Sequence, residues 1–224
     1  MAMNLTNRTL GDIAATIPAS TRVFLRNRLD FCCKGQRSTL SEACRERGLE
    51  AAAIADEITR EAHQHSELEV WAQRSNADLV SHIIEHFHAG LRRDVPPLIE
   101  AAARVERVHA NKDAVPSGLA AHLDILWREL SAHMAKEETI LFPLLLAPDS
   151  GRAAAPVRRM LEEHESHGRA LERTRDLTGD LEAPANACAT WRALYDGLEN
   201  LEAQLMEHVH LENNILFLRA LEAS

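Results

Sequence analysis

The same pair of polar residues interrupts the apolar face of two helical segments. His133 and Glu137 lie in one segment, and His208 and Glu212 lie 75 residues later in the other. In each pair the residues are four apart, and leucines at three- and four-residue intervals place both pairs on the face that a helix turns to the core. The triplet "ILF" follows both glutamates at the same distance. Any fold for this chain must therefore hold two acids and two bases inside a helical core.

Four long helical segments are predicted from residue 75 onward, joined by short turns rich in Pro, Gly and Asp. The His–Glu pairs lie in the second and fourth segments. The first and third segments carry inward histidines of their own, His88 and His164, which are 76 residues apart. Pro96 and Pro97 should bend or break the first segment. This order predicts an antiparallel four-helix bundle, built as a duplicated helical hairpin.

The first part of the chain has shorter helical stretches with frequent breaks. One of them begins with Thr39 and Glu42, the pattern of a capping box. We therefore expect an all-α protein of two domains, a small helical domain at 1–68 and the bundle at 75–224, with a linker between them.

Composition excludes several classes of function. A formal charge of −9 without a basic stripe argues against a nucleic-acid or anionic-membrane binder. No apolar run is long enough to span a bilayer and no signal peptide is recognisable, so we expect a cytoplasmic protein. Four cysteines in a chain of 224 residues do not form a disulfide framework, and we expect reduced thiols. The sequence leaves the oligomeric state open, a homodimer included.

Six polar side chains are predicted to point into the bundle: one histidine from each helix, and a glutamate from two of them. They are His88, His133, Glu137, His164, His208 and Glu212. No Lys or Arg shares these inward faces. Burying two carboxylates without a compensating positive charge would cost more than a typical margin of stability. The set therefore predicts a metal centre.

Other histidines fit this pattern less well. His167, three residues after His164, also fits the inward stripe, so the sequence leaves open which of the two is the ligand. His210 follows a predicted ligand by two residues and should point away from the centre. His82 and His86 are predicted to lie on the outer side of their helix.

The number of donors predicts two metal ions rather than one. Four imidazoles and two carboxylates are too many for a single tetrahedral zinc. Two divalent ions, with two histidines each and both carboxylates bridging, would each have four protein ligands and room for a small exogenous ligand. Imidazole and carboxylate suit iron, manganese and zinc alike, so the ligand types leave the metal open.

The order His-x-x-x-Glu followed by "ILF", present twice, resembles the hemerythrin-type (HHE) cation-binding bundles. Ferritin-like di-iron bundles use Glu-x-x-His instead. The resemblance implies a non-haem di-iron centre with an oxide or hydroxide bridge, held by the six residues named above, and makes manganese or zinc less favoured. Oxygen-carrying hemerythrins use one more histidine than can be assigned here, which implies a more open coordination site.

Further motifs narrow the resemblance. "LDFCCKG" near the N-terminus, with "RVERVH", "HMAKEETILFP" and "HVHLENNILF" in the bundle, resembles the iron–sulfur cluster repair proteins of the RIC or ScdA type over essentially the whole chain. One small departure is Leu218, which stands where Pro143 stands in the other repeat. The resemblance implies repair of clusters damaged by oxidative or nitrosative stress, through iron donation or through binding or reducing nitric oxide. Iron–sulfur proteins or an assembly scaffold would be the clients, and nitric oxide or oxygen the small ligand.

The main alternative is a hemerythrin-like protein that binds or senses nitric oxide or oxygen without turnover. A di-metal oxidase or peroxidase and a metal-free interaction bundle are two further alternatives. Whether the protein is an enzyme is left open by the sequence.

Two cysteines are adjacent in a predicted turn, Cys32 and Cys33. An ordinary disulfide between neighbours is strained, and Lys34 beside them would favour a thiolate. Spacing alone equally allows one buried and one incidental cysteine, whereas the resemblance implies a thiol-redox, nitric oxide or iron-transfer role. Cys44 and Cys188 are expected to be structural.

Overall fold

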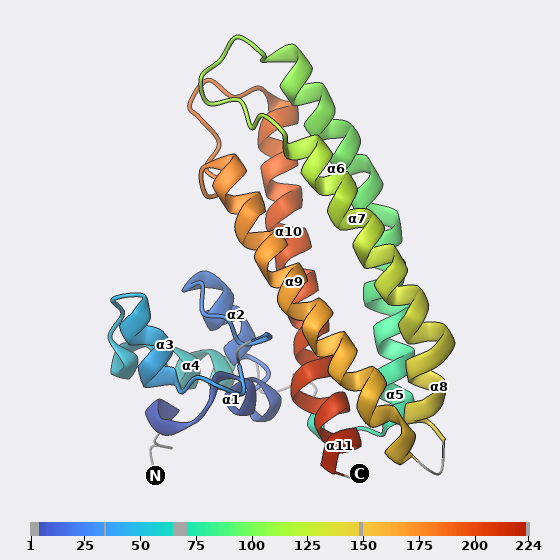
Figure 1. Cartoon of the computed structure of the whole chain (residues 1–224). Helices are drawn as coiled ribbons and strands as arrows, with labels where there is room; N and C mark the ends of the chain where they lie inside the picture. Colours follow the sequence, from blue (N-terminus) through green and yellow to red (C-terminus); the bar gives the residue numbers. More distant parts are fainter. Residues whose placement is uncertain (1–4, 34, 65–70, 148–149, 223–224) are drawn as a thin grey trace. The chain divides into compact units, whose positions relative to one another are not determined.

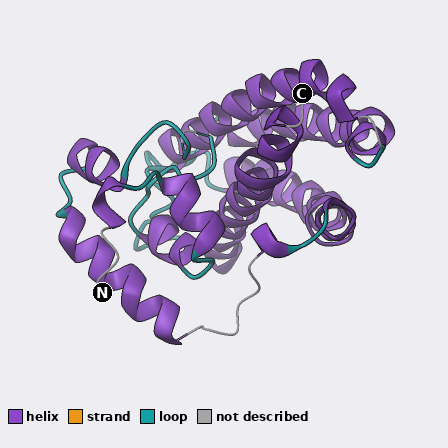
Figure 2. Cartoon of the chain, turned by 90° about the horizontal axis from the view of Figure 1, so that it is seen from below, coloured by secondary structure: helices purple, strands orange, loops and turns teal. Residues whose placement is uncertain are grey.

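A computed structural model of the chain describes residues 5–33, 35–64, 71–147 and 150–222. Within these ranges the fold is all-α, as predicted, without a β-strand (Figure 2). None of the helices in the same ranges is long and apolar enough to cross a membrane. Of the expected linker, residues 69 and 70 lie outside the described residues, and Trp71–Gln73 form a short 3-10 helix. Residue 68 also lies outside the described residues, so the domain boundary there stays a prediction.

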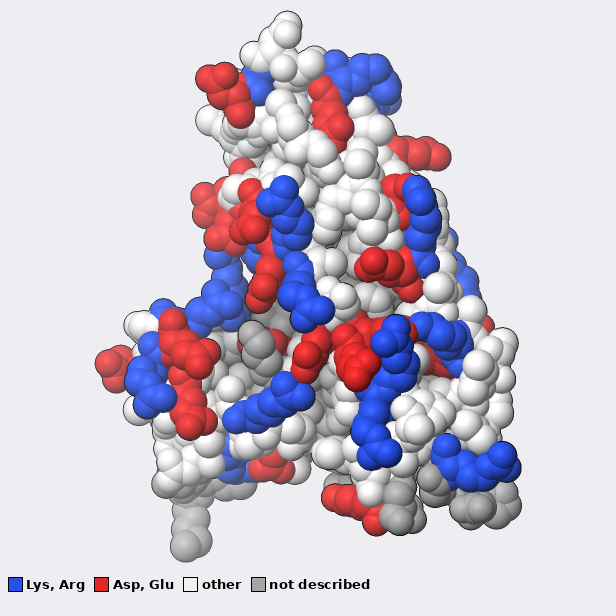
Figure 3. Space-filling model, in the orientation of Figure 1, with Lys and Arg blue, Asp and Glu red and all other residues white. Residues whose placement is uncertain are grey.

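The described residues of the chain form two compact units. The bundle unit comprises residues 81–147 and 158–205, and the terminal unit comprises 1–80, 148–157 and 206–224. Surface ion pairs occur in both, and acidic and basic side chains are interspersed on the face shown in Figure 3.

The bundle unit contains four antiparallel helical rods (Figure 1). Its elements are the π-turn Ile83–His88 with α6 (Ala89–Val108), α7 (Leu119–Lys136) with the π-turn Glu137–Leu141 and α8 (Phe142–Leu145), and the greater parts of α9 (Ala154–Thr178) and α10 (Ala189–Leu211). The predicted leucine stripes form its core: the buried residues include Leu123, Leu126, Leu130, Leu194, Leu198 and Leu201. Polar contacts join neighbouring rods, for example Arg175 on α9 with Glu202 on α10 at 2.9 Å.

The two prolines do not break the first long helix, because α6 continues through Pro96 and Pro97. Proline lacks the N–H that would bond the carbonyl four residues earlier, which affects Arg92 and Arg93. Both arginines are exposed, so water can bond their carbonyls, and the cost of the two prolines is small.

A π-turn, rather than a proline kink, interrupts the helix upstream of α6. Each turn of a π-helix contains about one residue more than a turn of an α-helix, which shifts the phase of the side chains that follow. His82 and His86 were placed on the outer side of the helix by α-helical phase. His86 is exposed and His82 is half-buried, in agreement with this placement. Their expected separation from Phe87 is wrong, because both rings pack edge-on against it, with ring centroids 5.4 and 4.9 Å away.

The terminal unit is built from short helices. They are α1 (Leu10–Thr16), α2 (Ser20–Arg26), α3 (Leu40–Glu46), α4 (Ala51–Gln64) and most of α5 (Asn76–His82), with the end of α10, the π-turn Glu212–Leu216 and α11 (Phe217–Glu222). The predicted capping box is confirmed, since Thr39 and Glu42 exchange side-chain and backbone hydrogen bonds at the start of α3. Phe24 and Phe31 lie at the centre of its core.

The start of α1 lies against the π-turn Glu212–Leu216. A Cβ atom added to Gly11 would lie 2.6 Å from Asn214 Oδ1, and Asn214 is itself held by hydrogen bonds. We therefore expect Gly11→Ala to destabilise the protein by about 1–3 kcal/mol through overpacking, as measured by urea unfolding.

A second helical glycine provides the matched control. A Cβ atom added to Gly90 would meet only the end of the flexible Gln204 side chain, at 3.3 Å. Gly90→Ala should therefore gain up to about 1 kcal/mol from helix propensity. The two substitutions should have opposite signs, and an equal gain in both would show that Gly11 does not need to be small.

Candidate metal centre

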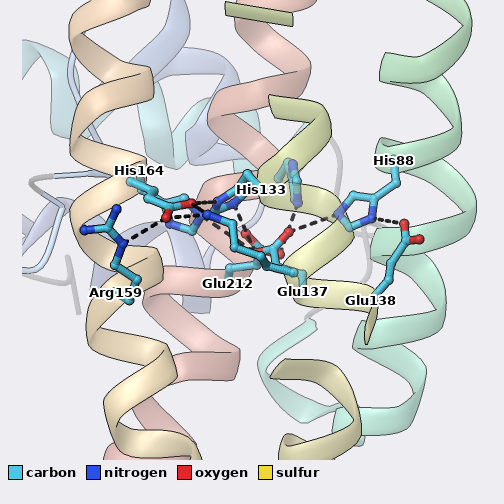
Figure 4. A network of polar contacts seen from close by, with 10 residues as sticks. His88, His133, Glu137, Glu138, Arg159, His164 and Glu212 are labelled. Atoms are coloured by element: carbon cyan, nitrogen blue, oxygen red, sulfur yellow. Dashed lines mark hydrogen bonds and ion pairs between the residues drawn. The ribbon is translucent and has the colours of Figure 1, made fainter. Parts of the chain in front are cut away.

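Glu137 lies fully buried among three imidazoles of the bundle unit (Figure 4). Its Oε1 is 3.1 Å from His133 Nε2 and 3.9 Å from His164 Nε2. Its Oε2 is 3.4 Å from His88 Nε2. The two carboxylate oxygens thus face histidines from different helical rods, which is the arrangement that a bridging carboxylate needs.

The Nε2 atoms of His133 and His164 face each other at 3.0 Å. The ligand atoms of these two residues and Glu137 all lie within 4.8 Å of one another, and the same spacing holds for His88 and Glu137. His133 bonds a carboxylate through Nδ1, which assigns the proton to Nδ1 and leaves the Nε2 lone pair directed inward. Inward lone pairs around a buried carboxylate suit a first-row divalent cation.

The second His–Glu pair repeats this geometry within the terminal unit. His208 Nε2 lies 3.1 Å from Glu212 Oε1, the same separation as between His133 and Glu137. Both members are buried, with 1% and 0% of their surface exposed. Glu212, like Glu137, is the first residue of a π-turn. The repeated sequence therefore folds twice into the same local structure.

His167 and His164 differ in what they contact. Only His164 brings Nε2 toward His133 Nε2, whereas His167 is buried with its ring edge-on to the His133 ring, at 4.8 Å between centroids. The structure thus favours His164 as the inward donor of α9 and gives His167 a packing contact with the ring of a neighbouring donor.

His210 has a buried position of its own in the terminal unit. Its Nδ1 accepts a hydrogen bond from Asn214 Nδ2 at 2.9 Å, and its ring packs edge-on against Phe31 at 5.5 Å. Burial lowers the pKa of His210 to about 3, so the imidazole is neutral. The sequence predicted that it points away from the other inward histidines, but did not predict that it is buried.

Two carboxylates that the sequence reasoning missed hold the histidines in place. Glu138 Oε1 lies 2.7 Å from His88 Nδ1, and Glu163 Oε2 lies 3.0 Å from His133 Nδ1. Carboxylates in this position fix the tautomer and the orientation of a metal-binding imidazole. Each is a neighbour in sequence of an inward residue, but nothing in the sequence shows which outward glutamate meets which ring on another helix.

Basic side chains keep both outer carboxylates ionised. Burial raises the pKa of Glu163, but hydrogen bonds from Lys136 and His133 outweigh it and bring the pKa to about 2. Arg159 donates a further hydrogen bond to Glu163 at 3.0 Å. Burial likewise raises the pKa of Glu138, and bonds with His88 and Arg92 lower it by more. The ionised carboxylate is the form that accepts a hydrogen bond from Nδ1–H of the histidine.

We expect Glu163→Gln to weaken metal binding by about 10- to 100-fold, because His133 loses its charged anchor. Competition against a chromogenic chelator measures this affinity. Glu162→Gln is the matched control, since the neighbouring Glu162 is 70% exposed and pairs only with Arg159 at the surface. Equal affinities in the two variants would show that the Glu163–His133 contact does not orient the donor.

Cys32 of the terminal unit does not match the expectation of a thiolate. Hydrogen bonding with Cys33, followed by burial, raises the pKa of Cys32 well above its usual value. Lys34, the cation predicted to favour a thiolate, lies outside the described residues. The expected thiolate is therefore wrong for Cys32, which is a protonated thiol in the absence of a bound cation.

Comparison with known proteins adds two family matches and many close relatives. The model for the hemerythrin HHE cation binding domain matches residues 79–220, and that for the ScdA_N domain, of unknown function, matches residues 6–62. The chain is 43% identical over 215 residues to an iron-sulfur cluster repair protein YtfE from Pectobacterium atrosepticum, covering 96% of this chain and 97% of the relative. Proteins of the same name from Musicola paradisiaca and Citrobacter koseri are 42% and 40% identical over 219 residues, covering 98% of this chain and 98% and 99% of the relatives.

Proposed function

Since the chain belongs to the hemerythrin HHE cation-binding family, we propose that it is a di-iron protein that repairs damaged iron–sulfur clusters. The name shared by its full-length relatives supports this function. The observation that carries it is Glu137, buried between the imidazoles of His88 and His133 with one oxygen toward each.

We propose as metal ligands the same six residues that the sequence singled out. They are His88, His133, Glu137, His164, His208 and Glu212. For His208 and Glu212, support comes from a geometry that repeats the one of His133 and Glu137. Two non-haem irons are the proposed cofactor, and when bound they would supply redox chemistry and a position for nitric oxide or oxygen.

The protein's own residues keep the metal-binding atoms of the histidines and glutamates in position. Glu138 and Glu163 fix His88 and His133 with Nε2 inward, and Lys136 keeps Glu163 charged. Glu137 is fully buried, so bulk water does not compete for its carboxylate. This arrangement would favour the binding of divalent cations.

Repair of a damaged cluster enzyme tests the function directly. A [4Fe–4S] hydratase inactivated by nitric oxide should regain activity faster with the iron-loaded protein than with the same amount of free ferrous iron. Glu137→Gln should abolish the gain, and Glu129→Gln, an exposed change on the same helix, should preserve it. A stable nitric oxide adduct without recovered activity would overturn the repair function and indicate a binding protein.

We further propose that iron–sulfur proteins or their assembly scaffold are the clients and that the protein works in the cytosol. None of the four cysteines forms a disulfide in the described structure, which suits a reducing compartment.

A further inference from the structure

Three potential ligands meet in the loop between α2 and α3 of the terminal unit. Cys32 Sγ lies 3.4 Å from Cys33 Sγ and 3.4 Å from Asp30 Oδ1. All three ligand atoms lie within 4.8 Å of one another. The backbone N–H of Cys33 donates to Asp30 Oδ1 at 2.9 Å, which ties the carboxylate to the loop. Cys32 is buried, whereas Asp30 and Cys33 are half-buried.

We propose that Asp30, Cys32 and Cys33 form a second cation site, for a divalent ion that accepts thiolate ligands. Metal–sulfur bonds of about 2.3 Å in a tetrahedron place two sulfurs about 3.8 Å apart, and a sulfur and an oxygen about 3.5 Å apart. Cys32 Sγ is 3.4 Å from both Cys33 Sγ and Asp30 Oδ1, so these two pairs differ from the ideal separations by only a few tenths of an ångström. Partial exposure leaves an entry path and a fourth position for a small ligand.

The loop suits a cation better than it suits redox chemistry of the thiols. A disulfide between adjacent residues is strained. Reactive thiolates lie in electropositive surroundings, whereas among the described residues the charged group in contact with Cys32 is the carboxylate of Asp30. A carboxylate beside two thiols adds negative charge for a bound divalent ion and opposes a free thiolate.

The cysteine loop is fastened to the π-turn that begins at Glu212. Asn213 Nδ2 donates to the carbonyl of Cys32 at 3.2 Å, and Asn214 Nδ2 donates to that of Phe31 at 2.9 Å. Asn213, which holds the loop backbone, is the next residue in the sequence after Glu212, a proposed ligand of the di-iron centre. Cation binding by the loop does not depend on the proposed function.

The first repeat, which contains His133 and Glu137, has different residues at the matching positions. Asn213 and Asn214 correspond to Glu138 and Thr139, and Glu138 holds His88. The same position of the repeat thus orients a histidine in the bundle unit and holds the cysteine loop in the terminal unit. This difference between the repeats is consistent with a separate function for the cysteine loop, the proposed binding of a cation.

Cobalt binding to the full-length protein tests the site. Protein already loaded with iron and titrated with Co²⁺ without oxygen should bind one further ion per chain and show thiolate-to-cobalt charge-transfer absorption in the near ultraviolet. Cys32→Ser and Cys33→Ser should each remove or strongly shift this band. Asp30→Asn should weaken cobalt binding by about tenfold or more. Cys188→Ser, which alters a cysteine of the bundle unit, should change neither the charge-transfer band nor the affinity for cobalt.

Two outcomes would overturn the site: a wild-type protein without the band, or a band that survives both loop substitutions. Circular dichroism on each variant separates loss of binding from loss of fold, and Asp30→Asn alters a half-buried side chain without emptying the core. Iron content measured on the same samples keeps the two proposals apart. Cobalt in the loop of a protein that holds no iron supports the site and contradicts the di-iron function.

Discussion

Glu137→Gln is expected to reduce iron binding at least about 100-fold, more than the loss of an outer carboxylate. The wild-type carboxylate presents one oxygen to His133 at 3.1 Å and the other to His88 at 3.4 Å. Glutamine keeps the shape but replaces one oxygen by an NH₂ group, which cannot bind a cation, and removes the negative charge. Iron per chain after anaerobic loading and gel filtration measures the effect.

The control lies two helical turns upstream on the same rod. Glu129 is exposed, so Glu129→Gln removes the same charge without reaching the interior. It should keep its iron. Wild-type iron content in Glu137→Gln would remove Glu137 from the ligand set and, with it, the bridging carboxylate on which the di-iron interpretation depends.

Removal of the iron is expected to lower stability strongly. Without cations, two carboxylates lie buried in the protein interior, and leaving a buried charge uncompensated costs about 3 kcal/mol or more. In a domain of this size that free energy corresponds to a fall of roughly 6–12 °C in the midpoint of thermal unfolding. Scanning calorimetry of iron-loaded and chelator-stripped protein, at the same pH and concentration, measures the difference.

Replacing Glu137 by leucine should have the opposite effect on the stability of the metal-free protein. Glu137→Leu replaces a buried charge by an apolar side chain of similar size, so the metal-free variant should unfold at a higher temperature than the metal-free wild type. Iron should then add little to its stability. If stripping leaves the wild type unchanged and Glu137→Leu is destabilising, Glu137 acts as a structural hydrogen-bonding residue rather than as a ligand.

Local periodicity was sufficient to predict most of the fold. The leucine stripes of α7 and α10 are buried as predicted, because burial on one face of a helix leaves a 3.6-residue pattern in the chain itself. The capping box at Thr39 and Glu42 was equally legible, since both partners lie within one turn. The candidate ligands were found in the same way, as polar residues in phase with apolar ones.

Side-chain directions were harder to predict near the proposed ligands, where regular α-helical spacing was assumed. The structure has π-turns at Ile83–His88, Glu137–Leu141 and Glu212–Leu216. A π-turn leaves no distinct pattern in sequence, because it adds one residue to an otherwise regular helix. It nevertheless changes which side chains of the turn lie next to one another, and His82 and His86 both contact Phe87.

The sequence by itself determined the helices, their inward faces and the residue types at the centre, because these follow from spacing along one chain. Only the tertiary structure decided which outward groups meet. It paired Glu163 with His133, buried His210 against Phe31, and placed Asn213 on the carbonyl of Cys32. Such contacts join residues far apart in the sequence, and they depend on how neighbouring helices are rotated and displaced along their axes. No periodicity within a single helix records that rotation.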